Sequence, residues 1–163
     1  MRKLIVPVLI IILALIACGS TDTGTQSNTS LPVDQQINQI VQNAGSTGSN
    51  IVSHYNAGGD NAEVIDEQTV GGFNNGQTIE AIKVDCFALE KALWTSSVAS
   101  NISDVEVRVN GQLQDSYGHT STGMWGSCEL KSDTAKQFAW ANLDQNQAWS
   151  VYDNTYILPS LNQ

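Results

Sequence analysis

The stretch DVEVRVNGQLQDSYG, residues 104–118, carries the strongest strand pattern in the chain and decides how the fold is interpreted. Its three valines, at alternate positions from Val105 to Val109, are separated by charged residues, which is typical of a strand with one buried and one solvated face. Asn110-Gly111 then predicts a two-residue type I′ turn, with residues 112–117 as the returning strand. Because residues 124–131 continue the sheet, we expect an antiparallel meander of three strands.

The part of the domain before this stretch predicts a hairpin and then a helix. Residues 62–70 favour a strand, and residues 78–86 favour a second strand that pairs with it. Asn75-Gly76 is the strongest turn signal between them. Residues 87–97 change to helical spacing, with Glu90 on the outer side of the helix.

Other segments add helices at both ends of the domain. Helical patterns occur in residues 34–44, 132–143 and 146–156, whereas residues 49–55 fit either class. Strands grouped in hairpins, with the helices segregated from them, indicate an α+β fold. We therefore expect an antiparallel sheet of about five strands covered by three or four helices, in a single domain over residues 32–163.

A different kind of segment precedes the domain. Arg2 and Lys3 are followed by fourteen apolar residues, 4–17, the layout of a secretory signal peptide. A spanning helix would need about 20 apolar residues. The next feature, Leu15-Ile16-Ala17-Cys18, resembles the lipobox of bacterial lipoproteins, although Ile16 is a less common second residue than Ala or Ser. The resemblance covers residues 1–20.

This resemblance implies that residues 1–17 are removed as a lipoprotein signal peptide and that Cys18 receives a diacylglyceryl group. The new N-terminus is often acylated as well, with a fatty acid such as palmitate. Residues 18–31 then form the lipidated cysteine and a flexible polar tether, because Gly19 to Ser30 contain no aromatic or aliphatic residue. The protein would be exported and held by lipid on the outer face of the cytoplasmic membrane or in the outer membrane.

The charge of the chain restricts its partners. The chain has 163 residues and a net charge of −9. Removal of residues 1–17 takes away Arg2 and Lys3 and leaves five basic and 16 acidic residues, a net charge of −11. Such a surface repels nucleic acids and anionic lipid headgroups, so we expect no nucleic-acid partner and a membrane contact made by lipid alone.

Two cysteines, Cys86 and Cys128, remain in the domain. An even number in an exported chain favours a disulfide, and the alternative is a pair of buried thiols. Neither cysteine belongs to a CxxC pair or has a histidine near it in the sequence, so we predict no metal and no cofactor.

The aromatic residues near the C-terminus offer a further candidate site. Trp149, Tyr152 and Tyr156 recur at i, i+3 and i+7, which is one face of a helix. They fit a core seam against the sheet, or else an exposed platform that binds sugar rings or an apolar ligand.

We predict no catalytic residue. The expected function is a lipoprotein whose domain acts outside the cytoplasm as a non-catalytic binding or structural module, with a protein, glycan or small molecule as partner. One alternative is a small envelope hydrolase acting on glycan or peptide, which would require His54, His119 and a carboxylate to meet in a pocket. Another is a carrier of lipid or another apolar ligand, which would require an internal cavity.

Overall fold

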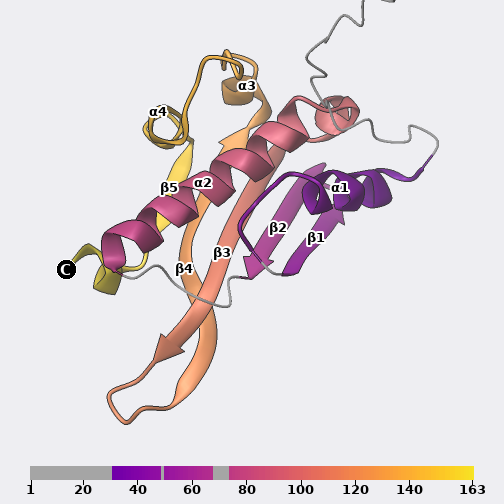
Figure 1. The fold of residues 1–163 in the computed structure, drawn as a ribbon. Helices are drawn as coiled ribbons and strands as arrows, with labels where there is room; N and C mark the ends of the chain where they lie inside the picture. The colour runs from indigo at the N-terminus through magenta and orange to yellow at the C-terminus, as the bar shows by residue number, and fades with distance from the viewer. Residues whose placement is uncertain (1–30, 49, 68–73) are drawn as a thin grey trace, which may run out of the picture.

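The computed structural model describes residues 31–48, 50–67 and 74–163. They form one five-stranded sheet with helices, which confirms the α+β class (Figure 1). The residues expected to form a signal peptide, Cys18 and nearly all of the expected tether lie outside the described residues. A helix with the length and hydrophobicity of a membrane span does not occur among residues 31–48, 50–67 and 74–163. The elements, in chain order, are α1 (Val33–Gln42), β1 (Asn50–Asn56), β2 (Asn61–Glu67), α2 (Asn75–Trp94), a 3-10 helix η1 (Ser97–Asn101), β3 (Asp104–Gln114), β4 (Thr120–Lys131), α3 (Ser132–Ala135), α4 (Gln145–Trp149), β5 (Asn154–Ile157) and a 3-10 helix η2 (Pro159–Asn162).

The strands lie in the sheet in the order in which they occur in the chain. All neighbours are antiparallel except β2 and β3, which are parallel. A parallel pair needs a long crossover connection, and α2 supplies it. The sheet is therefore mixed, where a purely antiparallel one was expected.

Helix α2 occupies the residues that were expected to form the turn and the second strand of a hairpin, so that prediction is wrong. Residues 78–86 are helical, and Asn75-Gly76 lies in the first turn of the helix, after Asn74, whose side chain accepts a hydrogen bond from the Gln77 amide. The alternating pattern was misleading because Ile82 and Cys86 are also four residues apart, which places them on one helical face. The buried positions follow helical spacing over the whole element: Thr78, Ile82, Asp85, Cys86, Leu89, Glu90 and Leu93.

The hairpin of β3 and β4 is longer than expected, and the three-strand meander is wrong. Asn110-Gly111 lies within β3, and the chain turns at residues 115–119 instead. There the Asp115 carboxylate accepts hydrogen bonds from the amides of Tyr117 and His119, at 2.8 and 2.9 Å. Gly118 adopts a φ of 86°, which favours glycine. Residues 111–114 and 120–123 pair only with each other among the described strands, as a two-stranded arm beyond the sheet (Figure 1).

The C-terminal helices are shorter than predicted. The helix expected over residues 132–143 ends at Ala135, and the one expected over residues 146–156 is replaced by α4, a turn and β5. The Asp153 carboxylate accepts hydrogen bonds from the Lys131 amide and the Thr134 hydroxyl, at 2.7 and 2.9 Å. These bonds tie the turn to the end of β4 and direct the chain back along the sheet.

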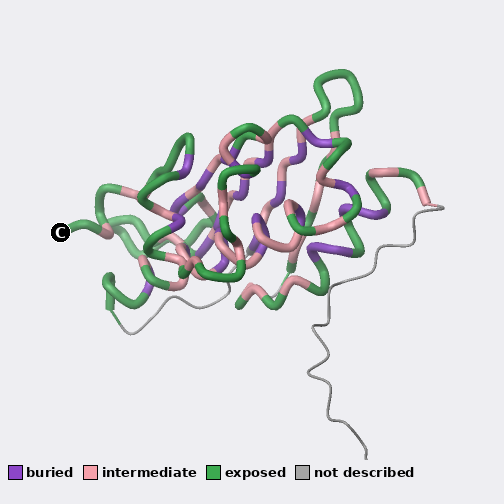
Figure 2. Tube along the Cα trace, turned by 90° about the horizontal axis from the view of Figure 1, so that it is seen from above, coloured by how far each residue is buried: buried purple, intermediate pink, exposed green. Residues whose placement is uncertain are grey.

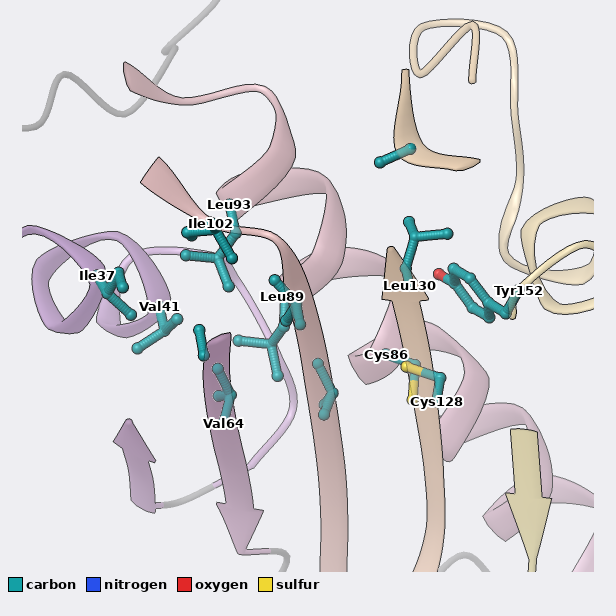
Figure 3. Close-up of a cluster of buried hydrophobic side chains, with 14 of the residues drawn as sticks. Ile37, Val41, Val64, Cys86, Leu89, Leu93, Ile102, Cys128, Leu130 and Tyr152 are labelled. Atoms are coloured by element: carbon teal, nitrogen blue, oxygen red, sulfur yellow. The ribbon is translucent and has the colours of Figure 1, made fainter. Parts of the chain in front are cut away.

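The hydrophobic core lies between the sheet and its helices. Helices α1 and α2 lie on the same face of the sheet in Figure 1, and buried and half-buried positions alternate along the strands in Figure 2. Buried residues from both layers form one cluster, including Ile37 of α1, Val64 of β2 and Leu89 of α2 (Figure 3). Among the described residues, no helix covers the other face, which we call the open face.

Candidate binding face of the sheet

Two rows of side chains cross all five strands on the open face. Residues paired across neighbouring strands point to the same side of a sheet, so the strand register defines each row. The polar row contains His54, Glu63, Glu106, Glu129 and Asn154. The mixed row contains Val52, Ile65, Arg108, Ser127 and Tyr156.

Arg108 connects the two rows. Its Nη1 lies 2.5 Å from Glu63 Oε1, and its Nε and Nη2 donate to the two oxygens of Glu106 at 3.0 and 2.9 Å. The hydrogen bond to Glu106 raises the pKa of the Arg108 guanidinium. The three side chains are 32–42% exposed, so water screens these pairs and they contribute little to stability. Their effect is to hold the guanidinium in a fixed position between two carboxylates.

A hollow of about 290 Å³ opens beside this ion pair. It is lined by His54, Tyr55, Asn56, Asn61, Ala62, Glu63, Asp104, Glu106 and Arg108. The open face carries the carboxylates of Glu63, Asp104, Glu106 and Glu129, against the cations Arg108 and Lys131. The face is therefore acidic in net charge.

The open face also carries exposed apolar side chains. Val52, Met124 and Tyr156 are each 37% exposed, and strand register places all three on this face. They are three of the five large hydrophobic residues that are exposed in the described part of the chain. The open face therefore combines partly exposed apolar side chains with fixed charges.

The two histidines occupy different sites. His54 lies beside Glu63 in the hollow, whereas His119 lies at the tip of the β3–β4 arm. There His119 Nδ1 is 2.9 Å from Asp115 Oδ2, and its side chain is 81% exposed. The described residues therefore do not bring both histidines and a carboxylate into one pocket, which was the requirement for the hydrolase alternative.

A buried polar cluster lies on the opposite side of the sheet, under α2. Glu90, which was expected on the outer side of its helix, is completely buried. Its carboxyl group accepts a hydrogen bond from Trp94 Nε1 at 2.7 Å, and Cys128 Sγ lies 3.9 Å away. Burial raises the pKa of Glu90 well above its usual range and so favours the neutral form of the carboxyl group. Tyr152 lies nearby, and its buried hydroxyl has no hydrogen-bond partner within the described residues.

Cys86 and Cys128 meet in this cluster, as free thiols in the structure. Cys86 projects from α2 toward Cys128 of β4, and the two sulfur atoms lie next to each other in Figure 3. Cys86 lies on a helix and not on the strand expected over residues 78–86. Whether the two cysteines are bonded stays a prediction.

A second pair of buried carboxyl groups lies near the loop after α1. Asp85 accepts hydrogen bonds from the amide and the hydroxyl of Thr47, at 2.7 and 2.9 Å. Asp66 is completely buried, and burial together with the charge of Asp85 raises its pKa to about 6. The Ser46 hydroxyl and the Gly48 amide lower the pKa of Asp66, but by less than burial and Asp85 raise it.

The aromatic residues named from the sequence do not share a helical face. Trp149 ends α4, Tyr152 is buried in the following turn, and Tyr156 lies in β5 on the open face. The rings of Trp149 and Tyr152 meet edge to face with centroids 6.2 Å apart. These two belong to the core seam, while Tyr156 alone is available to a ligand. The open-face rows were missed in the sequence because they depend on strand order.

Comparison with protein-family models, with curated proteins and with solved structures finds no match to this chain. Within the described residues, no group of three or more His, Cys, Asp or Glu side chains could hold a metal ion. The open face is thus the feature on which a functional proposal can be built.

Proposed function

We propose that this protein is an exported bacterial lipoprotein, anchored through acylated Cys18, whose domain binds a protein partner through the open face. The order of basic start, apolar run, lipobox and polar segment supports the anchor. The observation that carries the binding role is the uncovered sheet face, with its acidic row, its fixed arginine and its exposed Val52 and Tyr156. The domain acts without catalysis, outside the cytoplasm.

The partner is a segment that carries both basic and apolar side chains. Glu63, Asp104, Glu106 and Glu129 outnumber the cations of the face, so a basic segment gains electrostatic attraction. Apolar side chains of the same segment can cover Val52 and Tyr156. A second copy of this chain would bring two acidic faces together, and an anionic lipid surface would be repelled in the same way.

Binding can be tested with a synthetic peptide of alternating Lys and Leu residues and the full-length protein. We expect saturable binding that weakens with added salt, and a loss of affinity of about tenfold in Glu129→Lys. Asp133→Lys is the matched control, because it makes the same change of charge at a side chain that is 97% exposed on α3. Equal losses in both variants, or no binding, would contradict the proposal.

The anchor can be tested separately by Cys18→Ala. We expect the wild-type protein in the membrane fraction, with a mass that shows acyl chains on residue 18, and the variant outside that fraction. Cys128→Ser, which leaves the lipobox intact, should remain with the membrane. An intact leader or an unmodified thiol at position 18 of the finished wild-type protein would end the lipoprotein assignment.

A second candidate is the envelope hydrolase, favoured only by the position of His54 beside Glu63 and Glu106 in the hollow. Incubation of the protein with peptidoglycan fragments and with peptides distinguishes a hydrolase from a binding module. Release of products that is lost in Glu106→Gln would replace the binding role. The carrier of apolar ligands has less support, since the cavity beside Trp94 has a volume of only about 190 Å³ and contains Ser100, Ser132 and Lys136 in its wall.

A further inference from the structure

We propose that Cys86 and Cys128 are joined by a disulfide in the exported protein, and that this bond forms before α2 packs onto the sheet. The inference rests on the proposed export, because disulfides persist in oxidising compartments. The bond would link the crossover helix to β4, at a position opposite Val107 of the central strand β3. It would close the chain between residues 86 and 128, which are distant in sequence.

The placement of the two sulfurs carries the first part of the proposal. Cys86 is 0% exposed and Cys128 is 1% exposed. Each thiol lies close enough to affect the ionisation of the other, and the two side chains point toward each other in Figure 3. The two side chains therefore face each other across the contact between α2 and β4, as a disulfide requires.

The chemistry requires an external oxidant. Two thiols give up two electrons and two protons as the sulfur–sulfur bond forms. A disulfide-bearing oxidant outside the cytoplasm, either a protein or a small molecule, accepts them by thiol–disulfide exchange and leaves as a dithiol or as two thiols. The exchange begins with attack by a thiolate, so one cysteine must be both ionised and accessible.

In the folded domain neither an ionised nor an accessible cysteine is present, so the disulfide must form before the domain is fully packed. Burial raises the pKa of the Cys86 thiol and raises that of the Cys128 thiol well above its usual range. Cys86 and Cys128 are both buried, and the Glu90 carboxyl group lies 3.9 Å from Cys128 Sγ, so an oxidant in the solvent has no access to either thiol. The bond therefore forms while α2 is still away from the sheet, and packing then protects it from reductants.

The first experiment measures thiols in the full chain expressed in a bacterial host. Cells are denatured directly into a maleimide reagent, with and without prior reduction, and the thiols labelled in the membrane-bound protein are counted. We expect none before reduction and two after it, while the precursor has three cysteines, Cys18, Cys86 and Cys128. Two free thiols in the membrane-bound form would overturn the disulfide and leave the anchor standing. Three free thiols in a cytoplasmic protein would overturn both proposals.

The second experiment tests the order of events. The purified protein is reduced in denaturant, refolded with its thiols intact and exposed to oxidised glutathione. We expect oxidation to be at least about tenfold slower in buffer than in denaturant. Equal rates would show that the bond can form after packing.

Serine variants test the contribution of the bond to stability. Cys86→Ser and Cys128→Ser should both melt roughly 10 °C below the oxidised wild type. They should melt close to one another, because each removes the same bond. Melting of either variant at the wild-type temperature would contradict a disulfide in the purified protein.

Discussion

Asp66 is a carboxyl group that the fold keeps neutral at acidic pH. Its pKa is about 6 in the folded chain against a usual value of 3.8, chiefly because it is buried and secondly because Asp85 is near. Between these two values the folded chain holds a proton that the unfolded chain has released. The contribution of neutral Asp66 to the free energy of unfolding is therefore fully present below pH 3.8 and is lost as the pH rises through 6.

The variant Asp66→Asn should remove this dependence. Relative to wild type, its free energy of unfolding should rise between pH 4 and pH 7, by at most about 3 kcal/mol, because the amide never ionises. Urea unfolding at several pH values measures the difference, with the exposed Asp133→Asn as a control that should show no such rise. A difference that stays constant with pH would contradict the assigned pKa.

Burial of Glu90 should change stability with pH in the same direction as burial of Asp66. Its pKa is raised well above the usual value by burial, so stability from the neutral group is lost as the pH rises further. Glu90→Gln keeps an acceptor for Trp94 Nε1 and should gain stability over wild type as the pH rises above the usual pKa of a glutamate. Glu90→Leu removes both the titrating group and the acceptor of Trp94 Nε1. The difference in stability between Glu90→Leu and Glu90→Gln therefore includes the loss of the hydrogen bond, while neither variant titrates at this position. A stability difference between Glu90→Gln and wild type that does not change with pH would contradict the raised pKa of Glu90.

At the scale of elements, two Asn-Gly pairs show what local sequence can and cannot predict. Both were interpreted as hairpin turns, and neither is one. Asn75-Gly76 begins α2, where the buried face of the helix compensates for a glycine in the first turn. Asn110-Gly111 lies within β3, where the missing side chain makes room for the ring of Trp125. Tertiary packing decided both positions, and it is not visible in a local pattern.

Gly111→Ala tests this explanation of the long strand. A Cβ at position 111 would clash with the Trp125 ring, so the ring must move, and we expect a loss of about 1–3 kcal/mol in the free energy of unfolding. The matched control is Gly123→Ala, directly opposite in the register, where the Cβ would meet the mobile end of Leu113. Urea unfolding of both variants measures the contrast. Equal small effects would indicate that the Trp125 ring moves freely.

At the scale of the whole molecule, the α+β class and the first helix followed from the sequence, but the candidate site did not. Glu106 was assigned to a strand correctly, yet its neighbours in the row could not be named. Glu63 lies beside it only because α2 crosses over and makes β2 and β3 parallel partners. His54 comes from a segment that fitted either helix or strand. A binding face built from several strands depends on their order and register, which single segments do not encode.

The arrangement of the core predicts that the domain unfolds as one unit. Buried residues of both layers belong to one cluster, which contains Trp125 on β4, while Trp94, Trp140 and Trp149 pack against it from α2, the loop after α3 and α4. Because every tryptophan contacts the same core, tryptophan fluorescence and far-UV circular dichroism should give coincident urea transitions. The test is repeated with Trp149→Phe and with Trp125→Phe, so that the fluorescence comes from different ends of the core. A fluorescence transition that precedes the loss of secondary structure only while Trp149 is present would show that α4 and β5 unfold separately, and the single-core description would then be wrong.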